Sequence, residues 1–129
     1  MFESTFSYAL TNEPLVPDPT IFATEEGAEV QFLGTVRGIE DGKPITGIEY
    51  SVYLTMAELE LQKLCKRGQE EQGLHAVSIQ HRLGFVAACE PSILIRVKTK
   101  HSAEAFEICR WYLKEIKTSV PIWKKPVWA

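Results

Sequence analysis

Hydrophobic positions alternate with polar ones in several segments of the chain, and this two-residue period predicts half-buried β-strands. In AEVQFLGTVRG, residues 28–38, Val30 and Phe32 share one face while polar residues occupy the other. ITGIEYSVY and SILIRVKTK alternate in the same way, and HAVSIQHRLGFV is a further strand candidate. An Asp41-Gly42 turn signal separates the first two of these segments, so we expect them to pair as a hairpin with a long tip.

Helix signals begin near the N-terminus. Pro19 follows a possible N-cap at Asp18, and Gly27 is a typical stop, so this pattern predicts a short helix over 19–26. The residues before it end in PLVPDP and are expected to form an edge strand and a connector.

Two longer helices follow. Thr55 and Glu58 have the spacing of a capping box, and they precede an amphipathic run of about 17 residues that ends near Gly73. The last helix is expected to start at Ser102, a good N-cap residue, with Glu104 in its first turn.

The predicted elements mix strands and helices without the alternation that is typical of a parallel sheet. We therefore predict the α+β class, with a mostly antiparallel sheet and packed helices. The 129 residues suit a single domain over 1–129, because a chain of this length buries roughly two thirds of its unfolded surface. No repeat, low-complexity tract or linker divides the chain.

The charge balance narrows the classes of partner. The chain has a formal net charge of -3 and no polybasic segment, so we expect no nucleic-acid partner. No segment approaches the roughly 18 apolar residues of a membrane span, and the acidic start is unlike a signal peptide. We therefore expect no membrane association and a cytoplasmic location.

The cysteines and histidines show no metal-binding spacing, and no metal site is expected. Cys65, Cys89 and Cys109 are odd in number, lack C-x-x-C spacing and fall within apolar patterns. They are interpreted as reduced, mostly buried thiols, and a nucleophilic cysteine is the less favoured alternative.

Lys117 lies in the last turn of the predicted C-terminal helix, where the helical phase indicates its direction. Phe106, Leu113 and Ile116 define an apolar stripe, and with Phe106 at zero Lys117 falls near about 20° and Lys114 near about 80°. We therefore expect Lys117 to point along the buried face and Lys114 to reach water. Two interpretations stay open: a lysine that snorkels to the helix C-terminus, or a desolvated amine that acts as nucleophile or base.

The residues after this helix carry a second lysine. Pro121 ends the helix and biases Val120 towards an extended conformation. Lys124 is then expected on a short extended segment, where Trp123 offers a flat wall to a ligand.

Other residues suggest that an anion binds near these lysines. Arg37 follows a strand and precedes a glycine-containing loop, where its guanidinium can bind a phosphate with two hydrogen bonds. His101 precedes Ser102, which places it near a helix N-terminus, a position that attracts anions. His81 and Arg82 end a strand and are equally consistent with a hydrogen-bonded structural pair.

Five segments, FLGTVRG, IEYSVYLTMAE, HRLGFV, HSAEAFEIC and KTSVPIWKK, occur in this order over about residues 26–125. In sequence and spacing they resemble the MoaE family, the large catalytic subunits of molybdopterin synthase. The resemblance implies an α+β fold of the α/β-hammerhead type that forms a homodimer within a heterotetramer. Each large subunit is then expected to bind a small ubiquitin-like sulfur carrier of the MoaD type, whose C-terminal Gly-Gly tail enters the active site as a thiocarboxylate.

The resemblance also implies a reaction and its residues. Two sulfurs pass to cyclic pyranopterin monophosphate, the substrate, and form the dithiolene of molybdopterin without a metal or redox cofactor. By position, Lys117 matches the family's active-site lysine beside the carrier tail, and Lys124 matches its second essential lysine. Arg37 and His101 match residues that contact the substrate.

The chain departs from the family pattern at Ser51, Ser102 and Pro126. The family usually has arginine where Ser102 stands, so one positive charge is missing from the expected anion site, and Lys100 is a candidate to supply it. These departures motivate an alternative, a non-catalytic family member that binds a ubiquitin-like tail or a pterin without turnover. A third interpretation is a phosphate-binding module that has no carrier partner.

Overall fold

The computed structural model describes residues 2–16 and 21–129. In chain order its elements are β1 (Thr5–Thr11), β2 (Ala28–Thr35), β3 (Ile39–Glu40), β4 (Lys43–Val52), α1 (Leu54–Glu71), β5 (Ala76–Arg82), β6 (Gly84–Ala87), β7 (Pro91–Thr99), α2 (Ser102–Ser119) and β8 (Ile122–Trp128). Two helices accompany mainly antiparallel sheets, so the predicted α+β class is confirmed.

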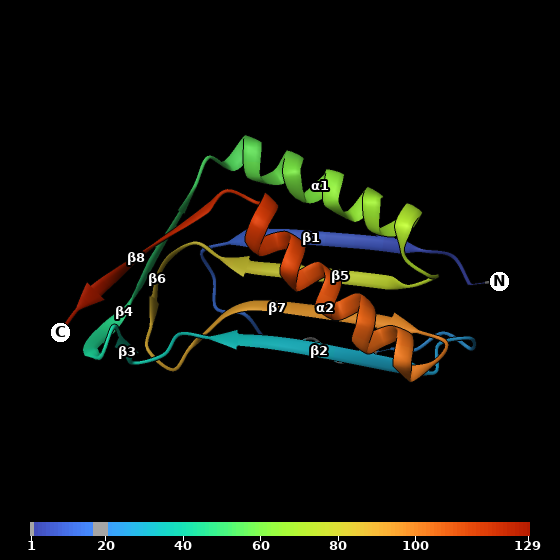
Figure 1. Ribbon diagram of the computed structural model, residues 1–129, viewed down its shortest axis with the longest axis horizontal. Helices are drawn as coiled ribbons and strands as arrows, with labels where there is room; N and C mark the ends of the chain where they lie inside the picture. The colour runs from blue at the N-terminus through green and yellow to red at the C-terminus, as the bar shows by residue number, and fades with distance from the viewer. Residues whose placement is uncertain (1, 17–20) are drawn as a thin grey trace.

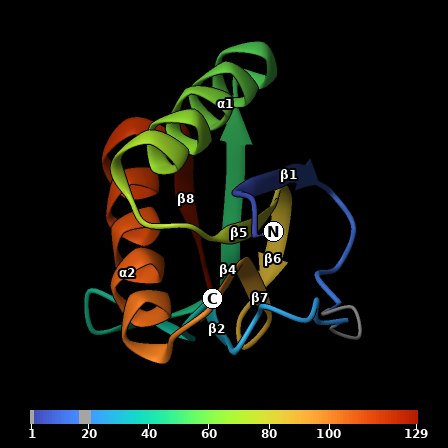
Figure 2. The ribbon, with the colours of Figure 1, turned by 90° about the vertical axis from the view of Figure 1, so that its right-hand side faces the viewer.

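The larger sheet has the strand order β1-β5-β7-β2. β1 runs parallel to β5, whereas β7 pairs antiparallel with both β5 and β2. Figures 1 and 2 show α1 and α2 on the same side of this sheet, with α2 crossing its strands. β1 lies at the edge of the sheet, as predicted for the N-terminal residues.

The main core fills the space between this sheet and the two helices. Alternate residues of the central strands face the helices, among them Val77 and Ile79 of β5 and Ile95 of β7. Leu61 and Leu64 of α1 are 1% exposed and pack into the same core. The residues on the inner face of the strands therefore pack against one apolar face of each helix. This contact fixes how α2 lies on the sheet.

A second, smaller sheet is built around β4, which pairs with β3, β6 and β8, all antiparallel. Its own buried cluster consists of Val36, Ile45, Ile48 and Val86. Figure 1 shows this sheet at the end of the larger sheet where β5 and β7 lead into and out of β6.

The predicted strand HAVSIQHRLGFV is broken in two by Gly84. This glycine has a φ of +81°, in the left-handed region that favours glycine, and it separates β5 in the larger sheet from β6 in the smaller one. A single segment of alternating residues thus serves two sheets.

The predicted hairpin between residues 28–38 and the segment ITGIEYSVY is wrong. β2 pairs with β7, and β4 pairs with β6 and β8 instead. The Asp41-Gly42 turn does exist, with φ values of 51° and 75°, but it folds the two-residue β3 onto the start of β4. A turn signal concerns only neighbouring residues, whereas β2 pairs with β7, which lies far along the chain.

Helix boundaries also differ from the prediction. Within the helix predicted over 19–26, residues 19 and 20 lie outside the described residues, and 21–26 contain only a turn closed by the Glu26 amide and the Ala23 carbonyl at 3.1 Å. α1 begins at Leu54 and has no side-chain cap from Thr55. His101 is the N-cap residue of α2, so Ser102 is its first helical residue and does not cap it.

Two of the three cysteines, Cys65 and Cys109, are buried as predicted, but Cys89 is exposed. Among the described residues, no three histidine, cysteine or acidic side chains gather as a metal site would require. Neither helix of the described chain has the length and apolar character needed to cross a membrane.

Candidate active site

A pocket of about 550 Å³ lies between the C-terminal part of α2 and strands of both sheets. Its walls come from β2, β4, β5, β7, β8 and α2. The lining residues are Phe32, Gly34, Thr35, Tyr50, His81, Ser92, Ile93, Leu113, Ile116, Lys117, Val120, Ile122 and Lys124. The pocket therefore combines apolar walls with polar and charged groups, as a site for a small polar molecule would.

Both predicted catalytic lysines, Lys117 and Lys124, line this pocket. Lys117 comes from the last turn of α2, and Lys124 comes from β8. Val120 joins the two elements in an extended conformation, with φ −95° and ψ 122°, as the following Pro121 predicts. The chain thus reverses after α2 and brings the second lysine back to the first.

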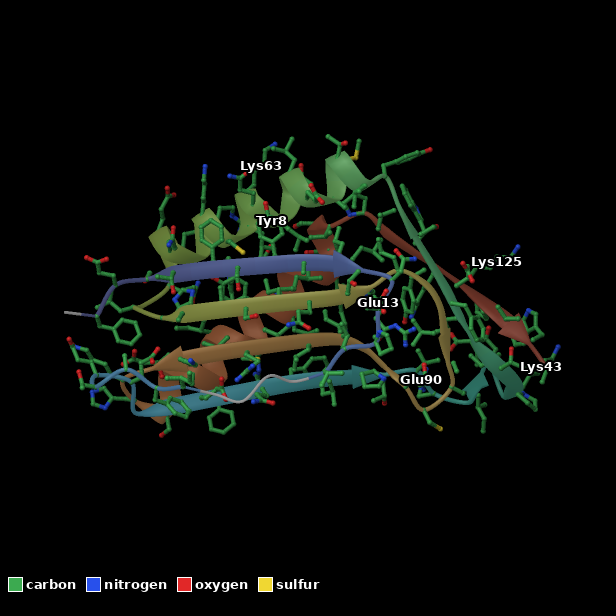
Figure 3. The ribbon with its side chains drawn as sticks, turned by 180° about the vertical axis from the view of Figure 1, so that it is seen from behind. Tyr8, Glu13, Lys43, Lys63, Glu90 and Lys125 are labelled. Carbon is green, nitrogen blue, oxygen red and sulfur yellow. The ribbon has the colours of Figure 1, made fainter. Side chains whose placement is uncertain are left out.

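Side chains alternate between the two faces of β8, and only one of these faces borders the pocket. Ile122 and Lys124 line the pocket, whereas the intervening residue, Trp123, does not. Lys125 also lies outside the lining and is seen on the outer side of β8 in Figure 3. Lys124 and Lys125 are therefore chemically alike neighbours with opposite positions relative to the site.

The predicted orientation of Lys117 along the buried face of α2 is wrong, since its side chain is exposed at the pocket. The error came from using Phe106 as the reference for the apolar stripe, because Phe106 is 65% exposed. The buried residues of α2 are Ala105, Ile108, Cys109, Tyr112 and Ile116. Their centre lies about 100° away from Phe106 and about 120° away from Lys117, which places Lys117 outside the buried arc. Lys114 is exposed, as predicted.

The sequence suggests only that His81 and Arg82 form a pair at the end of a strand. The structure places His81 in the pocket lining. It lies on the helix-facing side of β5, two residues beyond Ile79, and is 8% exposed. Its Nδ1 is 2.7 Å from the carbonyl oxygen of Arg82, and its ring meets the ring of Tyr50 edge-on with centroids 5.0 Å apart. Burial lowers the pKa of His81, and the hydrogen bond to the Arg82 carbonyl offsets only part of this effect.

Two other predicted ligand contacts lie off the pocket. Arg37 follows β2, but its side chain is 81% exposed and pairs with Glu40 at 3.8 Å. Trp123 packs edge-on against Tyr53, with ring centroids 5.2 Å apart, on the far side of β8 from Lys124. Neither residue is among the lining residues, so within one copy of the chain neither forms a wall of the site.

Lys100, His101 and Ser102 lie at the opposite end of α2 from Lys117. At 1.5 Å per residue, the 15 residues from Ser102 to Lys117 separate the two groups by about 22 Å. Lys100 is also paired with Glu25 at 3.4 Å, so it does not supply a free charge to the pocket. Within one copy, the structure does not bring these residues to the lysine site.

Tyr50, Thr35 and Ser92 are pocket residues that sequence reasoning missed. Tyr50 shares one face of the alternating segment ITGIEYSVY with Ile48, and that alternation was the available signal. The lining contains two lysines and no aspartate or glutamate among the described residues. The pocket is therefore suited to an anionic ligand that also has an apolar or planar part.

Comparisons with known proteins identify the family of the chain. The model of the family described as "MoaE protein" matches residues 10–119. Molybdopterin synthase catalytic subunits are similar: the one from Arabidopsis thaliana is 36% identical over 109 residues, 84% of this chain and 55% of that protein. The one from Thermoplasma volcanium is 37% identical over 103 residues, 80% of this chain and 75% of that protein. The human subunit is 37% identical over 102 residues, 79% of this chain and 54% of that protein.

The chain thus spans about half the length of the plant and human relatives. Among solved structures, molybdopterin synthase from Staphylococcus aureus superimposes with a TM-score of 0.84 and 30% identity, over 99% of this chain and 91% of that chain. A protein–protein complex of subunits 1 and 2 of molybdopterin-converting factor from Helicobacter pylori gives a TM-score of 0.66 and 25% identity, over 81% of this chain and 73% of that chain. The family model, the relatives and the fold agree, and the chain belongs to the MoaE family.

Proposed function

We propose that this chain is the large subunit of a molybdopterin synthase. In this role it transfers sulfur from the C-terminal thiocarboxylate of a small ubiquitin-like carrier to cyclic pyranopterin monophosphate. The observation that carries the proposal is the pocket in which α2 and β8 bring Lys117 and Lys124 together, in a chain of the MoaE family.

The chemistry of the two reactants explains why cations are needed. A thiocarboxylate and a cyclic phosphate are both anions, so they repel each other when they approach within one pocket. Two lysine side chains at the pocket offset this repulsion and can stabilise negative charge that develops on oxygen or sulfur. Sulfur moves as a nucleophile with its electron pair, and the proposed step therefore requires no metal or redox cofactor.

The proposed partner is a MoaD-type carrier with a C-terminal Gly-Gly tail. The complex of two subunits described for the Helicobacter pylori protein supports a small partner subunit. Two large and two small subunits would form the proposed heterotetramer. A cytoplasmic location remains part of the proposal.

The positions of His101 and Ser102 bear on the proposed homodimer. They are about 22 Å from Lys117 along α2 in one copy, which is too far for one small substrate to touch both groups. We propose that they contribute to the site from a second copy, whose α2 N-terminus reaches the pocket. Arg37 and Lys100 would contribute to the site either from a second copy or after leaving their ion pairs with Glu40 and Glu25.

Turnover of purified components tests the function. The chain, the thiocarboxylated carrier and cyclic pyranopterin monophosphate should together yield molybdopterin. Lys117→Ala and Lys124→Ala should each lower the rate by about 10²- to 10³-fold, the usual effect of removing one group that stabilises developing charge.

Each lysine has a matched control in the chain. Lys114→Ala alters the same helix one turn earlier, and Lys125→Ala alters the next residue of β8, and both residues lie outside the pocket lining. The controls should keep wild-type turnover. Full activity of Lys117→Ala and Lys124→Ala would refute the assignment of the site.

Mixing two inactive variants tests the shared site. If His101 acts on the partner's lysines, a mixed dimer of Lys117→Ala and His101→Ala copies contains one intact site. Equilibrated mixtures should then regain about a quarter of the wild-type activity, because half of the dimers are mixed and half of their sites are intact. No recovery would show that His101 and Lys117 do not meet across copies.

The non-catalytic alternative rests on Ser51, Ser102 and Pro126, and none of these residues lines the pocket. Ser51 pairs with Trp123 and Pro126 pairs with Ile48 in the sheet around β4. The alternative predicts carrier binding without product, and the same turnover assay distinguishes it from the proposed function.

A further inference from the structure

His81 is the one side chain of the described pocket lining that offers an uncharged, basic nitrogen. The other polar side chains of the lining are two lysines and the hydroxyl groups of Thr35, Tyr50 and Ser92, and no carboxylate is present. A reaction in this pocket that releases a proton therefore has His81 as its natural acceptor.

The tautomer of His81 follows from its surroundings. Nδ1 lies 2.7 Å from the Arg82 carbonyl oxygen, and a carbonyl only accepts hydrogen bonds, so Nδ1 carries the proton and donates it. In the neutral ring the lone pair then resides on Nε2, which makes no hydrogen bond to another described residue. Burial lowers the pKa of His81 and so favours this neutral form, and the hydrogen bond to the Arg82 carbonyl offsets only part of that effect.

The ring is also held in place. His81 is 8% exposed, is fixed at one end by the Arg82 carbonyl, and packs edge-on against Tyr50. The residues on either side of it in β5 are paired with β7 through Gln80 and with β1 through Arg82. The ring, which lines the pocket, therefore has little freedom to turn away from it.

The proposed function creates a step that needs such a base. When the thiocarboxylate sulfur bonds to a carbon of the substrate, it is still bonded to the carbonyl carbon of the carrier tail, so a thioester joins the two. Release of the carrier requires water to attack that carbonyl carbon, and neutral water is a weak nucleophile unless a base removes its proton.

We propose that His81 is the general base that hydrolyses this carrier–substrate thioester. The carbonyl carbon gains a bond to the water oxygen while one water proton passes to Nε2 of His81. The carbon then loses its bond to sulfur, which leaves on the pterin as a thiolate. The tail ends as a carboxylic acid that subsequently ionises, and His81 returns its proton to solvent. No atom changes oxidation state, and water is the sole co-reactant.

The test is single turnover with thiocarboxylated carrier and cyclic pyranopterin monophosphate, quenched in acid and analysed by intact-protein mass spectrometry. His81→Asn retains an amide donor for the Arg82 carbonyl but has no base. It should lower molybdopterin formation by about 10²- to 10⁴-fold, the usual contribution of a general base, while the carrier–substrate thioester accumulates. His81→Gln should show the same accumulation. Accumulation is the decisive readout, because a merely structural role would lower all steps together.

His75→Asn is the matched control. His75 is also buried and also donates from Nδ1 to a carbonyl, that of Gly73 at 2.6 Å, but it lies outside the pocket lining. It should lower thermal stability without accumulating thioester.

The inference rests on the proposed function, and the two can fail separately. Wild-type protein that forms neither thioester nor product would refute the proposed function itself. With active wild-type protein, normal turnover of His81→Asn, loss of product without thioester, or failure of both His81 variants to fold would each overturn the role of His81.

Discussion

The pair formed by His75 and Tyr112 offers a quantitative test of the core. Both residues are fully buried, and the Tyr112 hydroxyl lies 2.6 Å from Nε2 of His75. Since Nδ1 of His75 donates to the Gly73 carbonyl, Nε2 accepts and the tyrosine hydroxyl donates. This hydrogen bond ties the loop before β5 to the middle of α2. Replacing Tyr112 by phenylalanine removes the donor and leaves a buried acceptor without a partner.

The expected cost follows from that unsatisfied nitrogen. A buried polar group that loses its only partner destabilises a protein by about 1–3 kcal/mol. For a chain of this size, 1 kcal/mol corresponds to about 4 °C in Tm, so Tyr112→Phe should lower Tm by about 4–12 °C. Urea denaturation followed by circular dichroism measures the free energy of unfolding directly. Tyr53→Phe is the control, because Tyr53 is 68% exposed and should change stability by less than about 0.5 kcal/mol.

Gly68 gives an independent check on the same geometry. A Cβ atom added at Gly68 would overlap the Tyr112 hydroxyl, although alanine is the better helix former by about 1 kcal/mol. Gly68→Ala should therefore destabilise the wild type and should do so less in the Tyr112→Phe background. Equal effects in both backgrounds, or Tyr112→Phe behaving like Tyr53→Phe, would refute the reasoning.

Three further outcomes are expected. Burial lowers the folded-state pKa of His75 and of His81 from 6.5, so below about pH 6.5 the unfolded state binds more protons. The free energy of unfolding should then decrease as pH falls from about 6.5 towards the lowered values, as urea titrations at about pH 7.5 and about pH 5.5 will show. Cys89 is exposed, whereas burial raises the pKa of Cys65 to about 12, so a thiol reagent at neutral pH should modify Cys89 first, as peptide mapping will reveal. Gly84→Ala forces a side chain into a φ of +81° and should cost about 1 kcal/mol in urea denaturation.

The fold class was predictable because it depends on local periodicity, but strand partners were not. The alternation in β2 indicates a strand but does not indicate which strand pairs with it. Its neighbour is β7, and paired residues of the two strands are about 60 positions apart in the sequence. Gly84 illustrates the same limit, because its neighbours continue the alternation while its positive φ sends the two halves to different sheets.

The site shows how sequence reasoning can reach a correct residue by a faulty path. Lys117 and Lys124 do line one pocket, yet the phase argument had placed Lys117 inward by using the exposed Phe106 as a buried reference. The burial of His81 could have been predicted more safely, because His81 continues the buried face of Val77 and Ile79 along β5. The distance between His101 and Lys117 could not be seen without the helix between them.

The pairing of β8 with β4 has a consequence for the assembly of the site. β8 is the last element in chain order, and it joins the smaller sheet only through its pairing with β4. The main core between the larger sheet and its helices draws on β8 only through Ile122 at its margin. The core therefore depends little on β8, whereas the pocket takes Lys124 from it. Detachment of β8 from β4 would leave the main core in place and remove one lysine from the pocket, so the integrity of the fold and the completeness of the site are separable properties.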